Sequence, residues 1–150
     1  MASTSCIRPI AICVFRDGDK ILVAHGYDPN KNQHFYRPLG GGIEFGESAE
    51  ATVRREMKEE LDAEVEDLRR LAVLENTFVF EGRPGHEIVF VFDGRFSDPA
   101  IYRRARMALV ESNGEHFEAS WHSLDAIAAG SIPLYPDGLL ALLRAAPSLP

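Results

Sequence analysis

The sequence contains few cysteines. Only Cys6 and Cys13 occur among its 150 residues, and two thiols match none of the usual four-ligand zinc patterns. They are seven positions apart in a segment expected to be extended, so they would project from opposite faces about 23 Å apart and cannot form a disulfide. We expect two free thiols in a reducing compartment.

Long hydrophobic runs are also missing. No stretch approaches the ~18 uninterrupted apolar residues that a membrane-spanning helix needs. The apolar segment at residues 7–15 contains Arg8 and Pro9, follows no basic stretch and precedes no small-residue cleavage site, so it does not resemble a secretory signal. We therefore expect a cytoplasmic protein that does not bind membranes.

The chain has no excess of basic charge. It carries 16 Lys and Arg against 23 Asp and Glu, a formal net charge of −7, so its average field repels phosphate backbones and we expect no nucleic-acid partner. Hydrophobic residues make up 45% and charged residues 26%, which excludes collagen-like and disordered chains. Without an internal repeat or a linker, residues 1–150 are expected to form a single domain.

The expected secondary structure begins with strands and includes one prominent helix. Asp17-Gly18-Asp19 is typical of a turn. A glycine run precedes Ser48, which can cap a helix over Ala49–Leu61. Residues 97–118 give no clear assignment beyond a turn at Asn113-Gly114. The other expected elements are strands at 7–16, 20–25, 35–39, 68–80 and 87–96, an exposed loop at 26–34, a turn at 82–85, and short helices at 123–130 and 139–144.

The expected helix carries an unusual group of carboxylates. Glu56 and Glu60 lie one turn apart beside an apolar stripe, and Glu59 is adjacent to both. Like charges at this spacing destabilise a helix by a few tenths of a kcal/mol per pair. Something outside the helix is therefore expected to neutralise them.

Two kinds of neutralising group remain open on charge alone. Arg54 and Arg55 are close in sequence, and a solvated face of glutamates and arginines is the commoner cause of such a run. The other candidate is a hard divalent cation, because carboxylate oxygens held at helical spacing suit Mg²⁺ or Mn²⁺.

The spacing of residues before and within this helix favours the cation. Glu47 follows Gly41 after five residues, and the run Arg55–Glu60 follows after seven more. This arrangement resembles the signature of the Nudix hydrolase family, G x5 E x7 R E U x E E x G U, in which U is apolar. The match departs at Asp62, where the family has glycine, and at Leu39, where proline commonly precedes the two glycines.

The resemblance implies both a fold and an activity. The fold would be α/β, a Nudix-type α/β/α sandwich with a mixed central sheet. The activity would be Mg²⁺-dependent hydrolysis of a nucleoside diphosphate linked to another group, with a small nucleotide such as a nucleoside triphosphate as substrate. The alternative is a noncatalytic module of the same fold that binds a nucleotide or a partner. The family's prenyl diphosphate isomerase branch generally needs cysteine chemistry that is not recognisable here, and the oligomeric state stays open.

The resemblance also assigns roles to the carboxylates of the helix. Glu56 and Glu60 would be the principal ligands of Mg²⁺ or Mn²⁺. Glu59 would be a third ligand or, through a water, a proton acceptor. Arg55 would hold Glu47 and orient the ligating carboxylates.

Further site residues are expected outside the helix. Arg37 is expected to contact a substrate phosphate. Glu115, with Glu118 as second choice, is the expected late acidic residue that acts as an additional ligand or general base. Three glycines would let the backbone approach the phosphates or the helix closely: Gly40, Gly41 and Gly42. Five aromatic residues are candidates for stacking on a base, although aromatics on strands are more often part of the core: Tyr27, Phe35, Phe78, Phe80 and Trp121.

Overall fold

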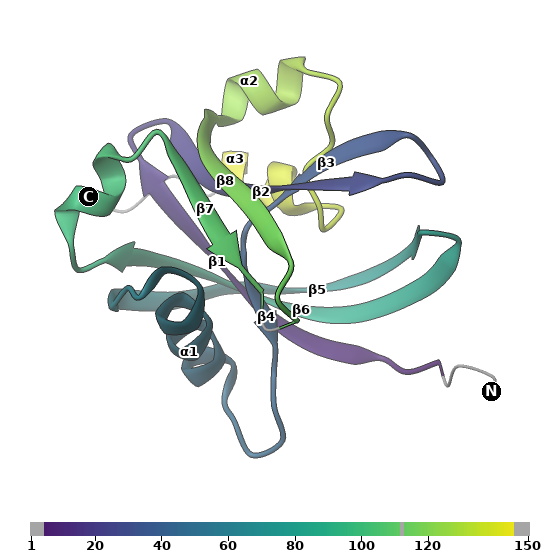
Figure 1. Ribbon diagram of the computed structural model, residues 1–150, viewed down its shortest axis with the longest axis horizontal. Helices are drawn as coiled ribbons and strands as arrows, with labels where there is room; N and C mark the ends of the chain where they lie inside the picture. Colours follow the sequence, from purple (N-terminus) through teal and green to yellow (C-terminus); the bar gives the residue numbers. More distant parts are fainter. Residues whose placement is uncertain (1–4, 112, 146–150) are drawn as a thin grey trace.

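The computed structural model describes residues 5–111 and 113–145. The strands are β1 (Arg8–Asp17), β2 (Lys20–Asp28), β3 (Gln33–Arg37), β4 (Leu39–Gly42), β5 (Val65–Phe80), β6 (Arg83–Phe96), β7 (Arg106–Val110) and β8 (His116–Ser123). The helices are α1 (Ala49–Leu61), α2 (Leu124–Ala129), α3 (Leu139–Ala145) and the 3₁₀ turn η1 (Pro99–Arg103). In this part of the chain the strands form one sheet of order β5-β6-β1-β2-β8-β7, with β3 paired to β2 and β4 paired to β1 (Figure 1).

The sheet separates two hydrophobic cores. Residues 11–15 of β1 are all buried. Because successive side chains of a strand point to opposite faces, both faces of this central strand are covered, and the segment is continuously apolar. Figure 1 shows α1 on one face of the sheet and α2 and α3 on the other. The expected α/β/α sandwich with a mixed sheet is thereby confirmed. Ala11, Cys13 and Phe15 pack with Val53 and Met57 of α1, whereas Ile12 and Val14 pack with Ile127, Leu139 and Leu143.

The pairing of β1 positions the glycine strand under α1. β1 is parallel to β6 and pairs with β2 only near their shared turn, at Arg16↔Ile21 and Asp17↔Lys20. Its earlier half pairs instead with β4, from Ile10↔Gly42 to Cys13↔Leu39. β4 therefore lies beside the central strand and leads directly into the loop that starts α1.

One expected loop and one expected turn differ in the structure. Most of the expected loop at 26–34 is strand, because β2 and β3 pair as far as Asp28↔Gln33. The turn of the second hairpin is at Glu81-Gly82 rather than 82–85. Both residues have positive φ, 52° and 76°, which matches the twist of a tight two-residue hairpin.

The late elements largely follow expectation. α2 begins after Ser123, whose Oγ accepts a hydrogen bond from the Ala126 N–H at 3.0 Å, and α2 ends before Gly130. The unassigned stretch 97–118 contains η1 and β7, and the turn expected at Asn113-Gly114 lies between β7 and β8. No helix within residues 5–111 and 113–145 has the length and apolar character to cross a bilayer.

Both cysteines are free, as expected. Cys6 is exposed ahead of β1, and Cys13 is buried inside it. Burial, followed by the charge of Asp93, raises the pKa of the Cys13 thiol well above its ordinary value. Cys13 is therefore an inert core thiol.

Both ends of α1 are capped by local hydrogen bonds. Ser48 Oγ accepts a hydrogen bond from the Ala51 N–H at 3.1 Å, which is a standard N-cap. At the other end Asp62 adopts the left-handed conformation, with φ 51° and ψ 40°, and its N–H donates to the Lys58 carbonyl at 3.0 Å. Asp62 thus occupies the conformation that favours glycine.

We predict that Asp62→Gly is neutral or stabilising and leaves activity intact. Glycine removes the strain of a left-handed non-glycine residue, roughly 1 kcal/mol. It loses an exposed ion pair between Lys58 Nζ and Asp62 Oδ1 at 2.9 Å, and such pairs contribute little. Thermal unfolding measures the result, with Asp62→Ala as the comparison that should lower the melting temperature. A lower melting temperature for Asp62→Gly would contradict this description of the helix end.

Candidate active site

Arg55 connects the loop before α1 to the carboxylates on the helix. Its Nε donates to Glu47 Oε2 at 2.7 Å, and its Nη2 donates to Glu47 Oε1 and the Gly42 carbonyl, both at 3.0 Å. Its Nη1 donates to Glu56 Oε1 at 2.8 Å and to Glu59 Oε2 at 3.3 Å. The planar guanidinium thereby fixes three glutamates and the end of β4 in one network.

The ion pair of Arg55 and Glu47 keeps its charges over a wide pH range. The hydrogen bonds from Arg55, and next that from the Thr52 hydroxyl at 2.6 Å, lower the pKa of Glu47 to about 2. The hydrogen bond with Glu47 in turn raises the pKa of Arg55 above its ordinary value. The sequence expectation that Arg55 holds Glu47 agrees with this geometry.

Glu60 is the carboxylate whose environment disfavours its charge most. Burial, followed by the charge of Glu56 and a hydrogen bond with Glu56, raises the pKa of Glu60 to about 8. Within the described residues its buried Oε2 has no hydrogen-bond partner. A buried carboxylate oxygen without a donor is costly, and a cation would satisfy it.

The carboxylate oxygens of Glu56 and Glu60 are the type of ligand that suits a hard divalent cation. Glu56 and Glu60 present carboxylate oxygens side by side, and oxygen ligands are those that Mg²⁺ and Mn²⁺ prefer. Among residues 5–111 and 113–145, however, no three His, Cys, Asp or Glu side chains are arranged as a ready ligand set. Arg55 instead binds one oxygen of Glu56 and one oxygen of the half-exposed Glu59.

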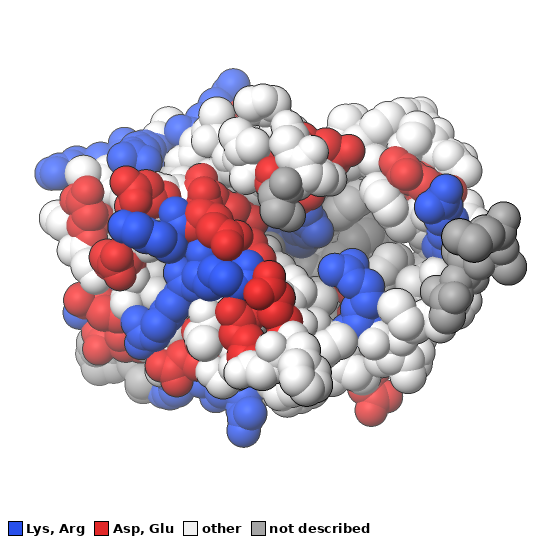
Figure 2. Space-filling view, turned by 60° about the horizontal axis from the view of Figure 1, so that its bottom comes forward, with Lys and Arg blue, Asp and Glu red and all other residues white. Residues whose placement is uncertain are grey.

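Two charged residues outside α1 extend this site. Arg37, from β3, donates through Nη2 to Glu111 Oε1 at 2.8 Å. The charges of Arg37 and Glu111 both act on the pKa of Glu60, the first lowering it and the second raising it. Figure 2 shows acidic and basic side chains interleaved on the face that carries α1, next to a hollow with basic side chains at its edge. Arg37 and Glu111 therefore lie close enough to Glu60 to act on its carboxylate.

The late acidic residue that the structure brings to this site is Glu111. Glu115 lies in the exposed turn between β7 and β8, where its N–H donates to Asn113 Oδ1 at 2.9 Å. Glu118 pairs with Arg106 on the surface at 3.6 Å. Sequence reasoning missed Glu111 because the stretch around it had no assigned element. The sequence feature that could have pointed to Glu111 is its position directly after the alternating segment that forms β7.

The glycines of β4 have distinct structural reasons. A Cβ on Gly40, whose φ is 157°, would fall on the Ala11 carbonyl oxygen, so β4 could not pair with β1. A Cβ on Gly41 would meet the Glu56 carboxylate. Gly42 uses its carbonyl to accept from Arg55. Gly40 is therefore required for the pairing of β4 with β1, and Gly41 for the placement of Glu56, whereas the contact of Gly42 uses a carbonyl that any residue would supply.

We predict that Gly41→Ala lowers kcat by about 10²-fold while costing about 1 kcal/mol of stability. The added methyl group displaces the end of a flexible side chain, Glu56, and not the backbone, so the fold tolerates it. A displacement of about 1 Å at a reacting group costs this much in rate. Gly18→Ala is the control for strain alone: the φ of 62° at Gly18 makes alanine strained by roughly 1 kcal/mol, but a Cβ there meets nothing within 4 Å, so kcat should stay at the wild-type value. Steady-state kinetics decide, and equal kcat values for Gly41→Ala and wild type would contradict the placement of Glu56.

Three of the five aromatic candidates, Phe35, Phe80 and Trp121, fall into two groups. Phe35, two residues before Arg37 on β3, contacts Phe80 with ring centroids 5.9 Å apart and Tyr135 at 5.6 Å. Trp121 instead stacks on Tyr102 at 5.4 Å and donates from its indole nitrogen to a backbone carbonyl, a packing role. The cluster formed by Phe35, Phe80 and Tyr135 continues from Arg37 away from α1.

Comparison with known proteins agrees with this description. The NUDIX domain profile matches residues 7–143, which include the glycine strand, α1 and all strands of the sheet. The chain belongs to the Nudix family. Proteins named as a Nudix hydrolase and as a pyrophosphatase are among its relatives.

Solved Nudix structures share the fold at low sequence identity. The MutT NUDIX hydrolase from Burkholderia pseudomallei is 20% identical, with a TM-score of 0.64 over 92% of this chain and 97% of that one. The E. coli ORF135 protein is 22% identical, with a TM-score of 0.58 over 94% and 91% of the two chains. At these identities the likeness concerns the fold alone.

One curated relative is closer over a short segment. The human mitochondrial NAD(P)H pyrophosphatase NUDT13 is 41% identical over 66 residues, which are 44% of this chain. The matched segment spans only 18% of that protein. The similarity therefore concerns part of the Nudix domain.

Proposed function

We propose that this Nudix protein hydrolyses the diphosphate bond of a small nucleotide with the help of Mg²⁺ or Mn²⁺. The observation that carries the proposal is the pairing of Glu56 with Glu60 beside the glycine strand, where Glu60 keeps a buried oxygen without a donor among the described residues. A structural carboxylate would be expected to find a donor. A carboxylate that receives a cation need not have one.

The helix carboxylates are assigned to the cation. Glu56 and Glu60 would hold it, with Glu59 as a third ligand or a proton acceptor. When bound, such a cation neutralises phosphate charge and lowers the pKa of a coordinated water. Arg55 and Glu47 keep the three carboxylates oriented, because the guanidinium contacts Glu47, Glu56 and Glu59 at the same time.

Residues outside α1 are assigned to the substrate. Arg37 would donate to a phosphate oxygen in exchange for its present partner Glu111. Glu111, once released, becomes an acceptor for a proton from the attacking water, the role that the sequence alone assigns to Glu115. Gly41 keeps a side chain out of the space occupied by Glu56, and Gly40, Gly41 and Gly42 together would let the backbone approach the phosphates.

The substrate class follows from charge and shape. A protein of net charge −7 attracts a polyphosphate only where cations screen the acidic site. Arg37 suits a phosphate, and the aromatic cluster that Phe35 of the same strand forms with Phe80 and Tyr135 suits a flat base. Nucleoside triphosphates are our first choice, and the partial similarity to NUDT13 adds NADH to the candidates.

A nucleotide panel tests the proposal. The purified protein is incubated with nucleoside triphosphates, NADH and ADP-ribose, with Mg²⁺, with Mn²⁺ and with EDTA, and the products are identified by mass. Cation-dependent cleavage within the diphosphate supports the proposal. Binding without turnover across the panel would instead indicate a noncatalytic nucleotide-binding module, and turnover in EDTA would remove the cation from the mechanism.

A further inference from the structure

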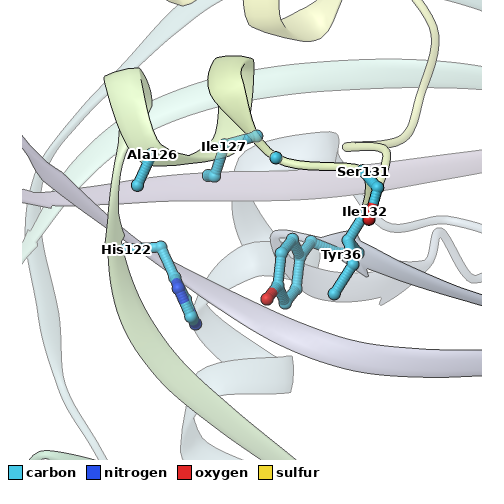
Figure 3. A pocket seen from close by; sticks show the side chains of 7 residues that line it. Tyr36, His122, Ala126, Ile127, Ser131 and Ile132 are labelled. Atoms are coloured by element: carbon cyan, nitrogen blue, oxygen red, sulfur yellow. The ribbon is translucent and has the colours of Figure 1, made fainter.

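A second group of polar side chains lies on the opposite face of the sheet from α1. His25 of β2 is the cross-strand partner of Tyr36 of β3, and Ser120 and His122 follow each other on the same face of β8. Tyr36 packs in the core shared with Ile127 of α2, not in the core shared with α1. Figure 3 shows the side chains of Tyr36 and His122 lying side by side below α2. This group takes no part in the proposed hydrolysis.

The two imidazoles converge on one hydroxyl. Ser120 Oγ lies 2.8 Å from His122 Nε2 and 3.3 Å from His25 Nε2. The two imidazole rings are 5.8 Å apart between centroids, and each lies within 4.8 Å of the Tyr36 ring. A hydroxyl has one proton to donate, so at most one Nε2 accepts from it and the other must carry a proton.

The same arrangement suits a metal ion in place of that proton. Neutral imidazole nitrogen is the commonest metal ligand in proteins. Burial, followed by the charge of His25, lowers the pKa of His122, which favours the neutral ring. His25 is exposed, so solvent ions can reach this residue.

A cavity adjoins one of the two histidines, His122. A cavity of about 250 Å³ lies between Tyr36, His122 and α2, and Ile127 and Ile132 form part of its wall. It is large enough for the waters or small anion that complete a coordination shell. The ion would therefore not need to enter the packed core.

The geometry points to a binding site for a late first-row divalent cation, Zn²⁺, Ni²⁺ or Cu²⁺, with His25 Nε2 and His122 Nε2 as ligands and Ser120 Oγ as third donor. Imidazole favours these ions, whereas carboxylates favour Mg²⁺ and Mn²⁺. Among the described residues no larger set of His, Cys, Asp or Glu joins the pair, so binding is moderate and selective by ligand type. The chain thus separates two classes of cation on two faces of the sheet.

The test is a titration of the purified protein with Zn²⁺ in excess Mg²⁺, followed by NMR of the histidine ring nitrogens and by calorimetry. We expect the Nε2 resonances of His25 and His122 to shift together, and His25→Gln or His122→Gln to weaken Zn²⁺ binding at least ~10-fold. His116→Gln is the control, because His116 is exposed at the start of the same strand, and it should bind Zn²⁺ like wild type.

Other outcomes overturn the proposal. Zn²⁺ that leaves both ring nitrogens unshifted, or that binds His25→Gln and His122→Gln as tightly as wild type, binds elsewhere. Ser120→Ala should weaken binding less than either histidine variant. If a histidine variant fails to fold, the ring-nitrogen shifts of the wild-type protein still decide, and none of these readouts depends on hydrolytic activity.

Discussion

Glu56→Gln is expected to lower turnover by about 10³-fold or more while the protein stays folded. Glutamine keeps the shape of the side chain and its contact with Gly41, but it presents one neutral oxygen where a cation needs a charged carboxylate. Loss of several kcal/mol of charge stabilisation in the transition state corresponds to this rate change. The measurement is the initial rate with the best substrate of the panel, with circular dichroism as the check on folding.

A second glutamate on the same helix provides the control for this variant. Glu50 is half exposed in the first turn of α1 and pairs with Arg54 at 3.1 Å, away from Glu60. Glu50→Gln should therefore hydrolyse substrate at the wild-type rate. Turnover by Glu56→Gln within tenfold of wild type, or an equal loss in Glu50→Gln, would remove the role given to Glu56.

Metal-free protein is expected to lose stability as the pH rises from about 5 to about 8. The folded-state pKa of Glu60 is raised to about 8, above its unfolded value near 4.3. Between these values the folded state binds more protons than the unfolded state, so the free energy of unfolding falls with increasing pH. The fall is complete above the folded pKa. We expect roughly 2–3 kcal/mol, or about 5–10 °C in melting temperature, in EDTA.

Glu60→Gln separates this effect from other titrations. The amide cannot ionise, so the variant in EDTA should be more stable than wild type at pH 8–9 and nearly equal to it at pH 5. The same variant should lose turnover, because a cation ligand is gone. Glu50→Gln should keep the wild-type pH profile. A Glu60→Gln profile that parallels wild type would show that Glu60 is already ionised in the folded metal-free protein.

The parts of the site that the sequence predicted are local in the chain. The signature spacing places Gly41, Glu47 and the helix carboxylates within about twenty residues, and Arg55 reaches all its partners inside that window. A helix repeats with a fixed period, so relative positions along it follow from spacing. The cap at Ser48 and the left-handed residue at Asp62 follow from the same local rules.

The parts that the sequence did not predict depend on pairing between distant segments. Arg37 and Glu111 are hydrogen-bonded although they are 74 positions apart in the sequence. The local sequence pattern around Glu111 does not predict that contact. The polar stretch expected as a loop at 26–34 is strand because its backbone pairs across the hairpin. Asp28 is buried there, and its carboxylate accepts the N–H of Glu81, 53 positions away. Local polarity is outweighed by hydrogen bonds that form only in the folded sheet.

Anomalous diffraction from crystals of the protein soaked with Mn²⁺ tests the central claim most directly. The account predicts a Mn²⁺ peak at about 2.0–2.2 Å from carboxylate oxygens of both Glu56 and Glu60, with Arg55 still bonded to Glu47. A Mn²⁺ peak elsewhere, with Glu60 Oε2 left without a partner and Glu56 still bonded to Arg55, would contradict it.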